Sequence, residues 1–224
     1  MHLPDGVMDP AVWAAGWIIA LVVIGIAVLR VGKNLDERKI PLMAVLAAGI
    51  FIAQRLNFPI GGGVSGHLIG AALATLLVGP WASIIIITVI LIIQALLFGD
   101  GGITTMGLNI LNMAVIASAV TWAVVAVAGA KHRRASTPVA AWASVFVAST
   151  VCAAQLAASF ALSGGAFGIN GVVAFPTMVG FHVLIAIGEA IITSGVILYL
   201  SKVAPEMLWI RKSPAANKAA APEA

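Results

Sequence analysis

The chain has 224 residues, of which 62% are apolar and only 9% are charged, with a mean hydropathy of +1.11 and a formal net charge of +4. A soluble domain is about 45–50% apolar and about 25% charged, so this composition excludes an ordinary soluble globular protein. It also excludes a disordered chain, which requires low hydrophobicity, and the single cysteine, Cys152, excludes an intrachain disulfide.

Seven apolar segments follow one another along the chain, separated by polar or glycine-rich linkers. They cover residues 12–31, 41–56, 67–79, 81–98, 105–130, 138–162 and 177–200. We expect all of them to be helices, since only helices and closed barrels satisfy backbone polar groups in lipid and the alternation typical of a barrel strand is absent. The predicted fold class is an all-α integral membrane protein with about seven transmembrane helices.

The distribution of basic residues predicts the orientation. Eleven of the twelve Lys and Arg residues lie in three clusters, after the first segment, after the fifth segment and in the C-terminal tail. With seven crossings all three clusters fall on the same side, and the positive-inside rule then places the N-terminus outside and the C-terminus in the cytoplasm. These flanking charges also explain the net positive charge, so we expect a multi-pass protein of the inner or plasma membrane and no nucleic-acid partner.

The predicted organisation is one transmembrane domain, residues 1–203, followed by a flexible cytoplasmic tail, residues 204–224. The outer side then carries the N-terminal hexapeptide and the loops 57–66, 99–102 and 163–175, and all three loops contain consecutive glycines. Irregular backbone at membrane depth persists only where protein buries it or where it lines a cavity. We therefore expect a packed loop assembly around the start of the short third segment, where His67 stands.

His2 has the chemistry of a terminal metal chelate. The terminal amine of Met1, the amide nitrogen of His2 and the imidazole of His2 can all reach one cation, and they form two fused rings. The amide must lose its proton, which requires a metal high in the Irving–Williams order. An imidazole from His67 would complete a square of four nitrogens, a geometry typical of Ni(II) or Cu(II). The alternative is that His2 is a chance residue at a frayed terminus.

Other polar residues have weaker signals. Asp5, Asp100 and Asn109 fall near the outer face, where each could orient a ligand or serve only as a helix cap or turn residue. His182 and Glu189 are ionisable residues on one face of the last apolar segment. They mark a functional site, or they hold that segment to its neighbours by hydrogen bonds.

Several blocks of the sequence resemble a known family. The opening Met-His-Leu-Pro-Asp-Gly of residues 1–6, and the blocks 59–82, 94–113 and 180–193, are similar to the NikM/CbiM family, the nickel- or cobalt-specific membrane component of energy-coupling factor transporters. The resemblance implies a transport subunit without catalytic activity, with Met1, His2 and His67 as metal ligands. It implies as partners a transmembrane coupling protein, two cytoplasmic ATPase subunits and, in many systems, a small accessory membrane protein.

The resemblance also suggests a docking surface. An Ala-x-x-x-Ala patch meets the coupling protein in that family, and here Ala44 and Ala48 have this spacing on the second apolar segment. We expect Ni²⁺ as the transported substrate, since four planar nitrogens suit Ni(II) better than Co(II). Cobalt uptake for cobalamin synthesis is the alternative, and an intramembrane metalloenzyme is a more remote one.

Overall fold

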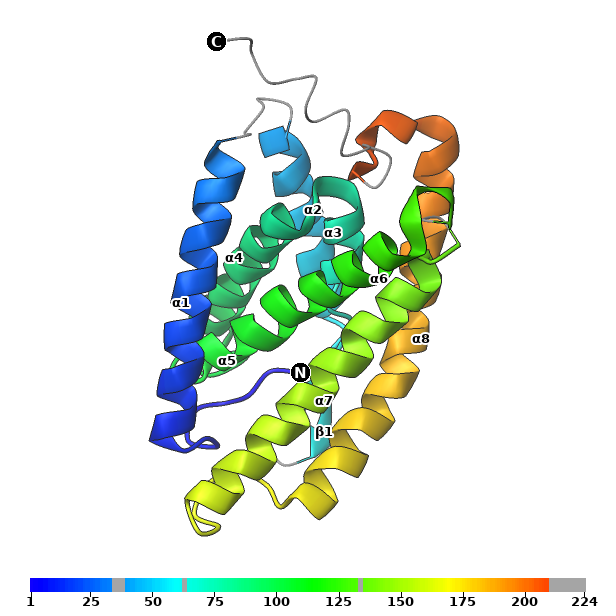
Figure 1. The fold of residues 1–224 in the computed structure, drawn as a ribbon. Coiled ribbons are helices and arrows are strands. Elements are labelled where there is room, and N and C mark those ends of the chain that lie inside the picture. Colours follow the sequence, from blue (N-terminus) through cyan, green and yellow to red (C-terminus); the bar gives the residue numbers. More distant parts are fainter. Residues whose placement is uncertain (34–38, 62–63, 133–134, 210–224) are drawn as a thin grey trace.

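The computed structural model describes residues 1–33, 39–61, 64–132 and 135–209 and is a bundle of helices with one small hairpin (Figure 1). The first half contains α1 (Pro10–Gly32), α2 (Lys39–Gln54), the antiparallel strands β1 (Phe58–Gly61) and β2 (Val64–Gly66), α3 (Ala71–Val78) and α4 (Pro80–Phe98). The second half contains α5 (Met106–Ile110), the π-helical turn η1 (Leu111–Ile116), α6 (Ala117–His132), α7 (Thr137–Leu162), α8 (Gly171–Val203) and the 3-10 turn η2 (Pro205–Met207).

Each of the seven predicted apolar segments forms a helix, because α5, η1 and α6 run on as one, and the predicted fold class is confirmed. Five of these helices are long and apolar enough to cross a membrane, with 19 to 33 residues and mean hydropathies of 1.8 to 2.6. Helix α2 has 16 residues. Helix α3 has only 8 residues, a rise of about 12 Å, so the third segment reaches across the bundle only together with the extended chain before it.

Helix α3 lies at the centre of the bundle. Six of its eight residues are buried, and it contacts α4, α6, α7 and α8. The outer helices have the opposite pattern, with large apolar side chains such as Leu29, Leu97 and Val127 left exposed. In a membrane protein these side chains face lipid, so the packed interior is built around the short helix and the segment that leads into it.

Two of the predicted outer loops differ from expectation. Within the predicted loop 57–66, the described residues form the paired strands β1 and β2, with Phe58 opposite Gly66, so backbone polar groups bond across the pair. The loop 163–175 is shorter than predicted, since α8 begins at Gly171. The side chain of Asn170 accepts a hydrogen bond from the amide of Val172 at 3.0 Å and caps the helix, and Pro176 lies inside the helix.

The residues directly after the predicted boundary at 204 pack against the bundle. Leu208 is fully buried and packs in one cluster with Leu76, Leu77 and Ile197, and the Trp209 indole lies against Gly79. Apolar side chains at these positions bury area against α3, so the packed chain continues at least to Trp209. The remainder of the predicted tail, residues 210–224, lies outside the described residues.

Candidate functional site

The N-terminal segment is inserted into the bundle rather than frayed from it. Met1 and Leu3 are fully buried, and the chain end lies between α5 and α7, at a level near the middle of the bundle (Figure 1). Asn109 on α5 holds Leu3 from both sides: its Oδ1 accepts from the amide of Leu3 at 2.8 Å, and its Nδ2 donates to the carbonyl of Leu3 at 3.1 Å. The amide of Gly102 donates to the same carbonyl at 2.9 Å.

Asp5 ties the segment to the loop before α5. Its carboxylate accepts hydrogen bonds from the amides of Ile103 at 3.0 Å and Thr104 at 2.7 Å, and from the hydroxyl of Thr104. Burial acts to raise the pKa of this carboxyl, but the hydrogen bonds from Thr104 and Ile103 outweigh it and lower the pKa. Asn109 therefore positions the N-terminal segment at Leu3, and Asp5 positions it two residues further along the chain.

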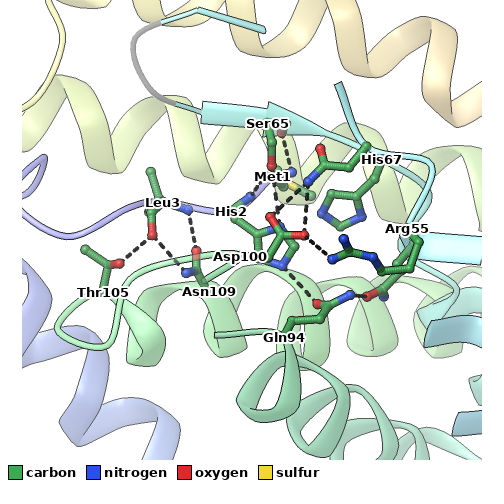
Figure 2. Close-up of polar contacts among 12 residues, drawn as sticks. Met1, His2, Leu3, Arg55, Ser65, His67, Gln94, Asp100, Thr105 and Asn109 are labelled. Carbon is green, nitrogen blue, oxygen red and sulfur yellow. Dashed lines mark hydrogen bonds and ion pairs between the residues drawn. The ribbon is translucent and has the colours of Figure 1, made fainter. Parts of the chain in front are cut away.

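The three nitrogens of the predicted chelate converge on one residue of the hairpin. The terminal amine of Met1 donates to the carbonyl of Ser65. The amide nitrogen of His2 and the ring Nδ1 of His2 each lie 3.4 Å from the hydroxyl of Ser65 (Figure 2). All three nitrogens thus contact Ser65, the amine through the carbonyl and the other two through the hydroxyl, so they lie on one side of the segment, as a tridentate ligand requires.

The hairpin also delivers His67. Strand β2 ends at Gly66, and the next residue places its imidazole against that of His2, with ring centroids 4.5 Å apart and an angle of 26° between the planes. His67 Nδ1 lies 2.6 Å from the carbonyl of Leu68; a carbonyl only accepts, so Nδ1 carries the proton. The other nitrogen, Nε2, keeps a lone pair and is buried without a hydrogen-bond partner, which leaves it available as a ligand.

Asp100 closes the site from the loop after α4. Its carboxylate lies 3.5 Å from His2 Nδ1, and it accepts hydrogen bonds from Asn57 at 2.9 and 3.2 Å and from Arg55 at 3.3 Å. Of the three polar residues expected near the metal, Asp100 is thus beside a predicted ligand. Asn109 contacts the backbone of Leu3 instead, and the Asp5 carboxylate contacts Ile103 and Thr104.

Burial keeps the amine of Met1 and the imidazoles of His2 and His67 uncharged. Desolvation lowers the pKa of the Met1 amine to about 5, and desolvation together with the nearby terminal amine lowers the pKa of His2 to about 4. The same two causes, in the same order, lower the pKa of His67 well below its usual value. At neutral pH the amine and both imidazoles therefore present lone pairs rather than charges.

Two functional candidates were missed in the sequence. Gln54 on α2 and Gln94 on α4 are fully buried, and Gln94 Oε1 lies 3.0 Å from His2 Nε2 (Figure 2). Gln94 donates in turn to Gln54 Oε1 at 2.8 Å. The available signal was the amide side chain near the end of each of these two apolar segments. A polar group in a membrane span needs a partner, so each glutamine could have been identified as a candidate.

Glu189 and His182 do not enter the predicted ligand set directly. The two carboxylate oxygens of Glu189 accept from the amides of Ile69 at 2.8 Å and Gly70 at 2.7 Å, which holds α8 to the start of α3. His182 Nδ1 donates to the carbonyl of Met178 at 2.7 Å. The holding role considered for this pair is therefore the one that Glu189 performs. Ala44 and Ala48 lie exposed on α2.

Comparisons with known proteins agree with this architecture. Residues 2–207 match the family CbiM, described as "Cobalt uptake substrate-specific transmembrane region". A protein of Haloquadratum walsbyi whose name assigns it provisionally to metal transport is 36% identical over 209 residues, covering 93% of this chain and 94% of that protein. The fused nickel transport protein NikMN of Rhodobacter capsulatus is 34% identical over 231 residues, covering 96% of this chain and 66% of that one.

A solved structure gives the same result for the fold. The crystal structure of a truncated transition metal transporter superposes on this chain with a TM-score of 0.86 at 34% identity, covering 91% of this chain and 99% of that one. These relatives are transport proteins, so the alternative of an intramembrane metalloenzyme is wrong. The chain belongs to the CbiM family, and it is a multi-pass membrane protein of metal transport rather than an enzyme.

Proposed function

We propose that the chain is the substrate-binding subunit of an ATP-driven importer and that it captures Ni²⁺ at the outer face of the membrane. The ligands are the terminal amine of Met1, the amide nitrogen and Nδ1 of His2, and an imidazole nitrogen of His67. The observation that carries the proposal is the convergence of the first three nitrogens on Ser65, with the unpartnered Nε2 of His67 buried beside them.

The side-chain inventory supports a ligand set that includes the terminus. In the part of the chain that the structure describes, no three His, Cys, Asp or Glu side chains lie close enough to hold one metal ion. The nitrogens of Met1 and His2 supply what the side chains lack; they are already buried, and the amine and the imidazole are uncharged at neutral pH. Ser65 would have to yield its contacts to the entering metal.

Nickel is preferred over cobalt because of the donor set. Two fused chelate rings place the amine, amide and imidazole nitrogens in one plane, and a fourth nitrogen from His67 completes a square that suits low-spin Ni(II). The relatives include both assignments: the family is described by cobalt uptake and the Rhodobacter capsulatus protein by nickel transport. Co²⁺ is therefore the alternative substrate.

The energy for transport would come from partners: a transmembrane coupling protein and two cytoplasmic ATPase subunits, with a small accessory membrane protein in some systems. Ala44 and Ala48 are proposed to meet the coupling protein, because both are exposed on one face of α2 and small residues let helices approach closely in lipid. The variant Ala48→Leu should leave metal binding unchanged and reduce ATP-dependent uptake in the assembled transporter; normal uptake would remove this surface from the proposal.

The first experiment is a titration of the purified, tag-free chain with Ni²⁺ and with Co²⁺, read by absorbance and magnetic susceptibility. We expect a yellow, diamagnetic nickel species at one equivalent, as a square of nitrogens requires. A paramagnetic nickel complex would overturn the planar geometry. Absence of stoichiometric binding of either metal would overturn the site, and tighter binding of cobalt than of nickel would exchange the substrate.

A further inference from the structure

We propose that Gln54 and Gln94 are positioning residues that hold the His2 imidazole with its proton on Nε2 and its lone pair on Nδ1, ready for the metal. This inference rests on the proposed function, since it concerns the nitrogen that would bind. Both glutamines come from apolar helices, α2 and α4, and both side chains are fully buried. Neither amide therefore has water as an alternative partner.

The direction of the hydrogen bonds follows from the far end of the chain of amides. Gln54 lies 2.6 Å from the carbonyl oxygen of Ile69. A carbonyl oxygen only accepts, so the atom of Gln54 that faces it must be the donor, Nε2. Turning this amide over would set two acceptors against each other in a buried place and leave both without a donor, which is unfavourable.

The remaining polarity is then determined step by step. With its Nε2 on Ile69, Gln54 presents Oε1 to Gln94, which donates from its own Nε2 at 2.8 Å. Gln94 consequently presents Oε1 to His2 Nε2 at 3.0 Å. That oxygen only accepts, so Nε2 of His2 must carry the proton, and the tautomer of the neutral ring is fixed by this bond.

The anchoring peptide group is held at its other end as well. The Ile69 carbonyl shares a peptide bond with the Gly70 amide, and that amide donates to Glu189 Oε1 at 2.7 Å. The carboxylate, the peptide group, the two glutamines and the imidazole are therefore joined in one chain of hydrogen bonds, and every bond has the same donor-to-acceptor direction. Aligned hydrogen bonds polarise one another, which makes Gln94 a stronger acceptor than an isolated amide.

A second acceptor, the Asp100 carboxylate, favours the opposite tautomer of His2, with the proton on Nδ1. The Asp100 carboxylate lies only 3.5 Å from His2 Nδ1 and would accept a proton carried there, which would remove the lone pair that the chelate needs. Asn57 and Arg55 hold this carboxylate on its other sides. The two glutamines stabilise the tautomer with the proton on Nε2, because Gln94 Oε1 is a buried acceptor for that proton.

The test measures two quantities on the full-length, tag-free chain above the pH range in which imidazole titrates. One is the ¹⁵N chemical shift of each ring nitrogen of His2 in the metal-free protein, assigned by difference with His2→Ala. The other is the nickel dissociation constant. The wild-type protein should show a protonated Nε2 and an unprotonated Nδ1. In Gln94→Leu the Nδ1–H form should appear, and the affinity should fall about 10- to 100-fold, as for other residues that orient a metal ligand.

Two variants separate positioning from packing. Gln94→Glu keeps an acceptor opposite His2 Nε2 but loses the donor to Gln54 Oε1, so it should keep the proton on Nε2 and bind nickel more tightly than Gln94→Leu. Gln155→Leu removes a comparable amide pair, since Gln155 and Asn112 exchange hydrogen bonds of 2.8 and 2.9 Å, and it should change neither quantity. If Gln94→Leu does not fold, Gln54→Leu removes the anchor and should shift the same two quantities in the same direction.

Three results would overturn the inference: a wild-type His2 with its proton on Nδ1, a Gln94→Leu protein with wild-type shifts and affinity, or an equal loss of affinity in Gln155→Leu. Failure of the proposed function looks different. In that case the wild-type protein binds no nickel, and the metal-free shifts still decide on their own whether the glutamines set the tautomer.

Discussion

The imidazole rings of His2 and His67 stack, with their centroids 4.5 Å apart and 26° between their planes. Ring lone pairs lie in the ring plane, so a metal cannot be bound by both rings while they face one another in this way. One ring has to turn when the metal enters. His67 is the ring free to do so, because its hydrogen bond is to the neighbouring Leu68 carbonyl, whereas the His2 ring is bonded to Gln94.

Extension of the N-terminus should abolish tight nickel binding. Two glycines placed before Met1 convert the amine into an amide and have to fit where Met1 is fully buried and bonded to Ser65. A single glycine is avoided, because it would make His2 the third residue, and the new amine, two amides and the imidazole could then chelate nickel by themselves. We expect the affinity to fall by at least about 100-fold, since loss of a residue that only orients a ligand already costs about 10- to 100-fold. Calorimetric titration of the extended and native chains checks this, with the same two glycines added after Ala224 as the control. Tight binding by the extended chain would exclude the amine as a ligand.

Replacement of His67 should weaken binding without disturbing the fold. His67→Ala removes the unpartnered Nε2 and leaves three nitrogens, so nickel affinity should fall at least about 100-fold and the planar absorbance band should change. His132→Ala is the control, because this imidazole is exposed at the end of α6. An unchanged dissociation constant in His67→Ala would remove His67 from the site.

The fold was largely predictable because lipid imposes a simple rule on the sequence. Long apolar segments such as 81–98 and 138–162 have no alternative to helix, and their helices begin at Pro80 and Thr137. The exceptions are local. Asn170 caps α8 six residues earlier than the apolar run suggests, and Leu208 is buried because a few apolar residues after the last span find α3 to pack against.

The proposed ligands could be named from the sequence, whereas the residues that position them could not. His2 and His67 have chemistry that can be recognised from residue type and position alone. Gln54 and Gln94 are 40 residues apart in sequence, and nothing in either apolar run indicates that the two amides meet, since a pairing across helices depends on how the helices are rotated. Asn109 was placed near the metal, but its contact is with the backbone of Leu3.

The pH dependence of nickel affinity should distinguish the amide proton of His2 from the protons that bind to the amine and the imidazole. Nickel displaces the amide proton of His2 at every pH, so affinity should weaken about tenfold for each unit by which the pH falls. Burial lowers the pKa of the Met1 amine to about 5 and that of His2 to about 4. Protons therefore compete with nickel for these two groups only below those pH values. The plot of log affinity against pH should therefore have a slope near one from pH 8 to about pH 6 and become steeper below about pH 5.

The measurement is a competition titration against a chelator of known proton affinity at each pH. His132→Ala should follow the wild-type curve. A slope that steepens already near pH 8 would mean that the amine keeps an ordinary pKa and is not buried as described. An affinity independent of pH between 8 and 5 would contradict nitrogen ligation altogether.

Gly102→Ala should disturb the site without touching any ligand. A Cβ at this position would lie 2.3 Å from the amide nitrogen of Asp5 and 2.5 Å from its Oδ1, so the N-terminal segment has to move away from the loop that holds it. Overpacking of this kind costs about 1–3 kcal/mol, which corresponds to a loss of about 5- to 150-fold in nickel affinity if the strain is relieved at the site. Gly25→Ala is the matched control, since a Cβ there meets nothing within 4 Å. The two variants are compared by nickel titration and by thermal unfolding. Loss of nickel affinity in Gly102→Ala with a small change in melting temperature places the strain in the N-terminal segment. Wild-type affinity in Gly102→Ala would show that binding does not depend on the position of Asp5.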